Sequence, residues 1–291
     1  MSTSNWFAVL AIASVLLKDD GQCQQIDSLT HEPGMAEPFD SAEVEGLTPR
    51  SVLEYSHYQI RAYGDSTETV FVGLFDRGRP VLGVRPEDDG SGVGYWLDSL
   101  LGHGTRQLVL QTYPLSTHCC YYYTIVDLAD SPRTVYSDEI FGDLVFYMET
   151  QDLDRDGISE IIRPVGSFDY FYAPHTESAF PSVVLKYSPK ERRYVVASRQ
   201  FEKYLLRGVD SLKEIVSKCE RNSIYDNGSS SEERCFSSIL RVVLDYVYAG
   251  RRNLGWDFFN SHYRASDKEV VRSKIEGVLG RSPVYRMTYA N

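Results

Sequence analysis

The chain has 291 residues, of which 42% are hydrophobic and 24% are charged. A chain of this length buries enough apolar surface to fold as one large domain or two modest ones without metals or disulfides. Its 30 Lys and Arg residues against 41 Asp and Glu residues give a net charge of −11. Because phosphate neutralisation dominates nucleic-acid affinity, this balance argues against nucleic acid and anionic lipid as partners.

The N-terminus carries a short apolar run from Trp6 to Leu17. The run is too short to span a bilayer and fits the apolar segment of a signal peptide. We therefore predict a signal peptide at residues 1–22, no integral membrane span in the mature chain, and a periplasmic or extracellular location. The alternative is an amphipathic N-terminal segment of a cytoplasmic protein, because residues 1–5 contain no Lys or Arg.

The middle of the chain has the pattern of a β domain. Residues 23–54 are polar, contain several prolines and show no sustained period, which predicts a linker or lead-in. From residue 55 to 200, short alternating runs are separated by turns, as is typical of antiparallel strands. Residues 87–94 predict a loop. The predicted strands are 58–63, 70–76, 80–85, 107–112, 119–127, 134–137, 144–149, 159–164, 169–172, 182–187 and 194–199.

The C-terminal part, residues 201–291, has a helical period. The predicted helices are 201–220, 232–249 and 270–279. Ser266 opens a capping-box sequence before the last helix, and Gly280 is a candidate C-cap. Strands first and helices second predict an α+β fold. We expect a mostly antiparallel β domain, propeller-blade-like or sandwich-like, followed by a helical region packed on it.

Two cysteines lie at the edges of predicted helices. The chain has 5 cysteines, too few for a disulfide scaffold. A bridge between Cys219 and Cys235 would close a loop of about 15 residues and stabilise the fold by roughly 3 kcal/mol. Two buried free thiols are the alternative.

One motif carries chemistry. Asp152, Asp154 and Asp156 alternate, Gly157 follows, and Glu160 closes the stretch. Calcium takes about six to eight oxygen ligands, which alternate acidic side chains around a tight turn can supply. Carboxylates this close repel one another without a cation. The pattern therefore predicts a metal site, with a solvated acidic turn as the alternative.

The motif does not fit an EF-hand. An EF-hand needs a bidentate Glu at the twelfth loop position, where this chain has Arg163. The residues after the loop, including Pro164, also predict a strand instead of the required helix.

The segment instead resembles the nine-residue Asp-x-Asp-x-Asp-Gly-x-x-Asp/Glu loop of the FG-GAP and VCBS-type repeats. In that family the loop joins two strands of a propeller blade and holds calcium as a structural ion. The resemblance implies side-chain ligands at Asp152, Asp154, Asp156 and Glu160 and a main-chain ligand at Ile158. It covers about residues 146–199 and one copy of a motif that such propellers repeat. The chain is also similar to uncharacterised exported bacterial proteins that pair one such loop with an upstream His-Cys-Cys segment.

That segment here is His118-Cys119-Cys120. On a strand, His118 and Cys120 would share one face, and two ligands do not make a zinc site. Buried structural cysteines are the favoured interpretation, over a vicinal disulfide and over catalysis.

Two aromatic runs could line a sugar- or peptide-binding surface. They comprise residues 121–123 and 168–172. Because alternation buries half of each run, core packing is the favoured interpretation.

These patterns predict a non-catalytic exported protein with a structural calcium site, acting as a binding or interaction scaffold for another protein or a cell-surface polymer. No catalytic motif supports an enzyme. The acidic residues Asp138, Glu139, Asp143 and Glu149 leave open a secreted hydrolase that uses an acidic pair in an interdomain cleft. A periplasmic inhibitor or immunity protein is the third hypothesis.

Overall fold

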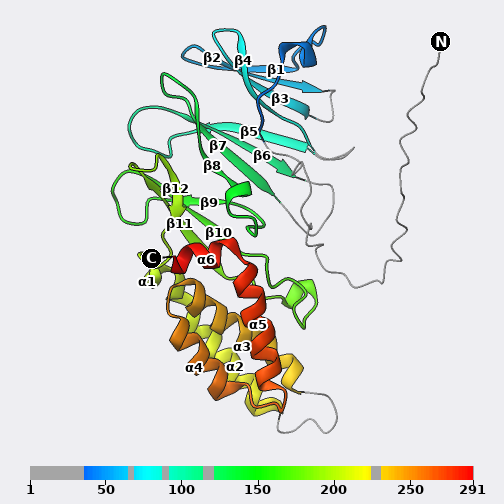
Figure 1. Cartoon of the computed structure of the whole chain (residues 1–291), viewed down its shortest axis with the longest axis vertical. Coiled ribbons are helices and arrows are strands. Elements are labelled where there is room, and N and C mark those ends of the chain that lie inside the picture. The colour runs from blue at the N-terminus through cyan, green and yellow to red at the C-terminus, as the bar shows by residue number, and fades with distance from the viewer. Residues whose placement is uncertain (1–35, 65–68, 87–91, 114–120, 224–230, 291) are drawn as a thin grey trace, which may run out of the picture.

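The computed structural model describes residues 36–64, 69–86, 92–113, 121–223 and 231–290. Within these ranges the chain forms three four-stranded antiparallel sheets followed by helices, so the predicted α+β class is confirmed. Figure 1 shows the sheets in succession along the long axis of the molecule, with most of the helices at the far end.

Each sheet is a meander in which every strand pairs with the next one in the chain. The first sheet contains β1 (Ser51–Tyr55), β2 (Tyr58–Gly64), β3 (Thr69–Asp76) and β4 (Arg79–Val84). The second contains β5 (Gly92–Asp98), β6 (Gln107–Tyr113), β7 (Tyr122–Asp127) and β8 (Arg133–Ser137). The third contains β9 (Glu149–Gln151), β10 (Glu160–Pro164), β11 (Ser182–Ser188) and β12 (Arg193–Val196).

The second sheet is buried on both faces. Leu108 and Leu110 of β6 belong to a core shared with the first sheet, whereas Val109 belongs to a larger core that extends through the third sheet into the helices. Successive residues of a strand point to opposite faces, so a doubly covered strand needs consecutive apolar residues. This explains the unbroken apolar run in β6.

The helices follow the third sheet and contact it. They are α1 (Glu202–Leu205), α2 (Val209–Ser223), α3 (Ser231–Tyr248), α4 (Arg252–His262), α5 (Lys268–Arg281) and α6 (Pro283–Tyr289). A disulfide between Cys219 and Cys235 joins α2 to α3, with a Cα–Cα distance of 5.7 Å. Helix α6 returns to the third sheet, where it lies against β12 (Figure 1).

Several predicted strand positions are wrong. A 3₁₀ helix at Ser41–Val44 and the first four residues of strand β1 lie inside the predicted lead-in at residues 23–54. β1 is an edge strand with no buried residue, so it leaves little apolar signal. Strand β5 begins at Gly92, inside the predicted loop at 87–94. Residues 169–172 form turns instead of a strand, and Tyr170 and Tyr172 have φ angles of 55° and 56° there.

The helix ends also differ from the predictions. Helix α5 continues through Gly280 to Arg281, so Gly280 is not a C-cap. Asp267, not Ser266, is the N-cap of α5, and its side chain makes no capping hydrogen bond. The sequence does not predict helices α4 and α6 individually, although both lie in the predicted helical region.

Two predictions concern residues outside the described ranges: the signal peptide at residues 1–22 and the segment His118-Cys119-Cys120. Of the helices that the described ranges contain, none has the length and apolar character needed to cross a membrane.

Candidate metal centre

The acidic loop connects β9 to β10, the strand-to-strand position that the sequence predicts. Hydrogen bonds from the backbone of the loop to its own aspartate side chains stabilise its turn. The Asp152 carboxylate accepts hydrogen bonds from the backbone N–H groups of Asp156 (3.1 Å) and Gly157 (3.0 Å). The Asp156 carboxylate accepts one from the N–H of Ile158 (2.9 Å). Gly157 has a φ of 86°, a left-handed conformation that glycine adopts without steric cost.

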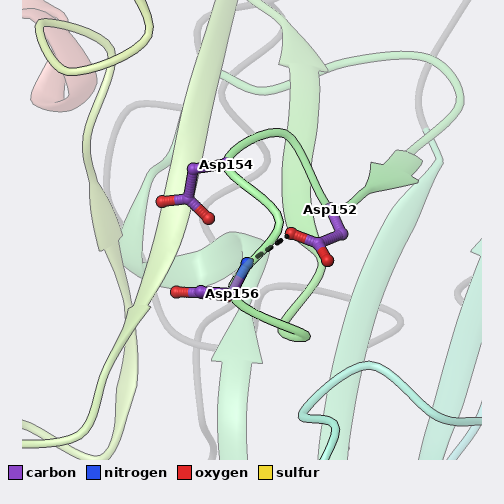
Figure 2. Close-up of side chains that lie close together, drawn as sticks. All are labelled: Asp152, Asp154 and Asp156. Carbon is purple, nitrogen blue, oxygen red and sulfur yellow. Dashed lines mark hydrogen bonds between the residues drawn. The ribbon is translucent and has the colours of Figure 1, made fainter.

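The three aspartates converge. Asp152, Asp154 and Asp156 each offer a carboxylate oxygen, and these three oxygens lie within 4.8 Å of one another. Figure 2 shows the Asp154 and Asp156 carboxylates pointing toward the neighbouring strand β11. The side chains of Asp154 and Asp156 are 41% and 39% exposed, so an ion from solvent can reach them.

Glu160 lies behind the aspartates at the start of β10, and its side chain has 0% exposure. One carboxylate oxygen accepts a hydrogen bond from the N–H of Leu153 (2.8 Å). The β10–β11 register pairs Ile161 with Leu185, so Glu160 and Lys186 face each other one step further along. The other oxygen of Glu160 lies 3.2 Å from the Lys186 Nζ.

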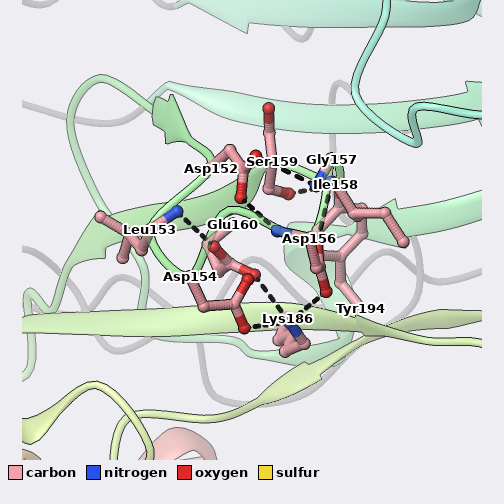
Figure 3. Close-up of polar contacts among 10 residues, drawn as sticks. All are labelled: Asp152, Leu153, Asp154, Asp156, Gly157, Ile158, Ser159, Glu160, Lys186 and Tyr194. Atoms are coloured by element: carbon pink, nitrogen blue, oxygen red, sulfur yellow. Dashed lines mark hydrogen bonds and ion pairs between the residues drawn. The ribbon is translucent and has the colours of Figure 1, made fainter.

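Lys186 is the residue that sequence reasoning missed at this site. Its Nζ also donates to Asp154 Oδ2 at 2.5 Å and to Asp156 Oδ2 at 2.6 Å (Figure 3). The sequence offers no local signal for it, because Lys186 belongs to β11 and reaches the loop only through the pairing of β11 with β10.

The electrostatics of the loop leave negative charge uncompensated. Three carboxylates, those of Asp154, Asp156 and the fully buried Glu160, contact the single ammonium group of Lys186, and Asp152 adds a fourth negative charge beside the other two aspartates. The hydrogen bond from Lys186 lowers the pKa of Asp156 below its ordinary value. Burial raises the pKa of Glu160 above its ordinary value, against the lowering effect of the bonds from Leu153 and Lys186. Burial lowers the pKa of Lys186, but its bonds to three carboxylates outweigh this and leave the pKa raised.

The loop is braced from behind by two other parts of the β domain. The N–H of Ser159 donates to the carbonyl of Leu100, just after β5, at 2.7 Å. The hydroxyl of Tyr194 in β12 donates to the carbonyl of Ser159 at 2.9 Å. Gly102 packs so closely that a Cβ there would lie 2.1 Å from the Gly157 carbonyl oxygen. The loop therefore joins the second sheet to the third.

The residues present fit a calcium ion in donor type and charge. Asp152, Asp154, Asp156 and Glu160 supply hard oxygen donors, which calcium prefers. Ile158, the main-chain ligand that the resemblance implies, lies within the same turn and packs its side chain against the core. The excess negative charge favours a divalent cation. The ammonium of Lys186, however, contacts three of these four carboxylates, so an entering ion must compete with it.

A second charged cluster lies further along β10. The Arg163 guanidinium is fully buried and donates to Asp138 Oδ2 at 2.9 Å, to the Phe146 carbonyl at 2.5 Å and to the Tyr121 carbonyl at 3.0 Å. The hydroxyl of Tyr136 donates to the other oxygen of Asp138. Both Asp138 oxygens thus have protein partners, and the cluster joins the second and third sheets.

The aromatic runs divide between core and surface. Tyr123 and Phe168 are buried, in agreement with the favoured core interpretation. The rings of Tyr121 and Tyr147 are tilted by 30° with centroids 4.4 Å apart, and their hydroxyls share a hydrogen bond of 2.8 Å. Tyr113 lies beside Tyr121 at 6.3 Å. Tyr147 is 65% exposed, which makes this trio an aromatic surface.

Comparisons with known proteins return no match: no family model, no curated protein and no solved structure is similar to this chain.

Proposed function

We propose that the protein is a non-catalytic β scaffold that works outside the cytoplasm, uses the Asp152–Glu160 loop as a structural calcium site of the FG-GAP type, and binds another protein or a cell-surface polymer. The observation that carries the proposal is the convergence of three carboxylate oxygens within 4.8 Å at a strand-to-strand turn, with negative charge in excess of the nearby ammonium.

The position of the loop supports a structural role for the ion. Ser159 is hydrogen-bonded to Leu100 on one side and to Tyr194 on the other, so the loop is tied to the second sheet and to β12. An ion bound to the aspartates would restrain the loop between these anchors. The meander of four strands in each sheet is also the arrangement of a propeller blade.

The Cys219–Cys235 disulfide supports a location outside the cytoplasm. Disulfides form and persist in oxidising compartments such as the periplasm and the extracellular space. Extracellular calcium sites bind with dissociation constants of about 10⁻⁴–10⁻³ M. A calcium site outside the cytoplasm therefore needs only a modest affinity.

The surface of Tyr113, Tyr121 and Tyr147 supports a binding role. Tyrosine rings present apolar faces together with a hydroxyl, and they contribute strongly to contacts with peptides and other partners. A hydrolase is less well supported, because two of its four candidate acids have structural partners. Asp138 pairs with Arg163, and Asp143 accepts a hydrogen bond from Ser167 at 2.5 Å.

Thermal unfolding with and without calcium tests the metal site. With free calcium about tenfold above the dissociation constant, binding adds roughly 1.4 kcal/mol to the free energy of unfolding. We expect a chelator to lower the melting temperature of the wild type and to have no effect on Asp154→Ala. Asp130→Ala, in another exposed turn, is the matched control and should respond as the wild type does. A wild-type melting temperature that calcium leaves unchanged would refute the structural ion.

Co-purification from the native host tests the binding role. The wild type should retain a partner protein or polymer that Tyr147→Ala loses, whereas Leu254→Ala, a side chain that is 49% exposed and lies outside both aromatic runs, should retain it. Equal retention by all three forms would show that the tyrosine trio is not the contact surface.

A further inference from the structure

We infer that Lys186 is a built-in cation of the acidic loop and that calcium displaces it, so that the loop exchanges between an ammonium-held and a calcium-held state. The inference rests on the proposed calcium site and concerns how that site is regulated.

The contacts of Lys186 identify the oxygens at issue. Its Nζ lies 2.5 Å from Asp154 Oδ2, 2.6 Å from Asp156 Oδ2 and 3.2 Å from Glu160 Oε1. These three side chains come from the middle and the end of the acidic motif, and the ammonium holds them together across the β10–β11 pair (Figure 3). The mutual repulsion that an empty loop would suffer is thereby reduced.

Calcium and the ammonium cannot use these oxygens at the same time. Calcium binds oxygen at about 2.3–2.6 Å, and the ammonium already lies 2.5 Å from Asp154 Oδ2 and 2.6 Å from Asp156 Oδ2. Two cations that share those oxygens would be in direct contact and would repel each other strongly. Calcium binding to Asp154 Oδ2, Asp156 Oδ2 and Glu160 Oε1 therefore requires Lys186 to withdraw.

Lys186 has room to withdraw. Its side chain is 22% exposed, and four methylene groups separate the ammonium from the backbone. The Nζ also lies 5.9 Å from the centre of the Phe201 ring, whose face offers a second favourable position for a cation. Asp152 makes its hydrogen bonds to the backbone of the loop, so it remains in place during the exchange.

The exchange has two consequences for the protein. The loop keeps its shape without calcium, because the ammonium replaces part of the missing positive charge. The affinity for calcium is lower than the four carboxylates alone would give, because the ion must displace a bound cation. Lys186 therefore shifts the calcium concentration at which the loop responds.

Calcium titration by isothermal calorimetry on the full chain tests this. Lys186→Met keeps the aliphatic length and removes the charge. We expect the variant to bind calcium about tenfold more tightly than the wild type, because a partly buried competing charge is gone. Without calcium the variant should melt about 2–4 °C lower, because the carboxylates lose their cation. Lys190→Met, on the exposed β11–β12 turn, is the matched control and should match the wild type in both measurements.

The reactivity of the lysine amine supplies a second readout that does not depend on affinity. We expect an acetylating reagent, followed by mass spectrometry, to modify Lys186 slowly without calcium and faster with calcium, while Lys190 reacts at the same rate in both conditions.

The outcomes separate the inference from the proposed function. Equal calcium affinity in the wild type and Lys186→Met, with unchanged Lys186 reactivity, would overturn the exchange and leave the calcium site intact. Binding by Lys186→Met alone would make Lys186 a permanent cation and overturn both the exchange and the structural calcium of the wild type. Absence of binding in both forms would overturn the calcium site itself.

Discussion

Strand β10 carries two charged side chains with no exposed surface, Glu160 at its start and Arg163 near its end, and their surroundings differ. Around Glu160, three carboxylates contact the ammonium of Lys186 in a partly exposed loop, and Asp152 adds a fourth negative charge nearby. Around Arg163, one guanidinium faces one carboxylate, that of Asp138, inside the core. The loop around Glu160 has excess negative charge and solvent access, which suit the entry of an ion. The buried pair of Arg163 and Asp138 has balanced charge and connects the second sheet to the third.

The Arg163 guanidinium makes directional hydrogen bonds in addition to its ion pair. It reaches the carbonyls of Tyr121 and Phe146 in addition to Asp138, and it lies over the Tyr123 ring at 4.7 Å. A planar group with several fixed donors suits this arrangement better than the point charge of a lysine would. The loop around Glu160 instead uses a flexible lysine, which can leave.

The largest expected effect comes from breaking the sealed pair. Arg163→Met leaves Asp138 buried without its cation, which should lower the free energy of unfolding by about 3–5 kcal/mol. Chemical denaturation with and without calcium measures this, and the loss should be the same in both conditions. Adding Asp138→Asn to Arg163→Met removes the isolated charge and should restore part of the stability. A loss that calcium corrects would show that the two clusters are one site.

The buried carboxylate of Asp245 in α3 adds a third case to the comparison of Glu160 with Asp138, because its contribution to stability depends on pH. Burial raises its pKa to about 6, although Arg241 lies 3.0 Å away and lowers it. A raised carboxyl pKa stabilises the fold fully below the unfolded value of about 4, and this contribution is lost as the pH rises through about 6. The shift corresponds to roughly 2–3 kcal/mol, since one pKa unit is about 1.4 kcal/mol.

Denaturation at pH 4 and pH 7 checks the role of Asp245. Asp245→Asn should gain stability relative to the wild type between these two values, because the amide carries no charge at either. Asp210→Asn, at a side chain that is 93% exposed, is the control and should show no such gain. A pH-independent difference between Asp245→Asn and the wild type would mean that burial does not control this carboxyl.

The sequence predicts that a residue belongs to a site when all of the site's residues lie in one short stretch of the chain. The acidic loop is one short stretch, so the sequence alone marks its aspartates and Glu160 as candidate ligands. Lys186 lies on the next strand, and only the pairing of β10 with β11 brings it to the loop. Arg163 appeared in the sequence only as a mismatch to an EF-hand, because its partner Asp138 follows a strand of another sheet.

The same reasoning applies to the fold. The amphipathic periods of α2 and α3 and the alternation of the middle strands are local signals, and they predicted the α+β class. The first strand, β1, is an exposed edge strand with no buried residue, and α6 is a single short helix that begins at Pro283. Neither leaves a pattern that distinguishes it from a loop.

The smallest expected effect tests whether loop shape and ion binding are linked. Gly157 has a φ of 86° and open space where a Cβ would lie, and so does Gly46, with a φ of 77°, far from the loop in sequence. Changing either glycine to alanine should cost about 1 kcal/mol in backbone strain. Only Gly157→Ala should also weaken the calcium-dependent rise in melting temperature, because its strain falls on the turn that gathers the three aspartates. If Gly46→Ala reduced the calcium response equally, general loss of stability would explain the effect, and the loop would not be the site that responds to the ion.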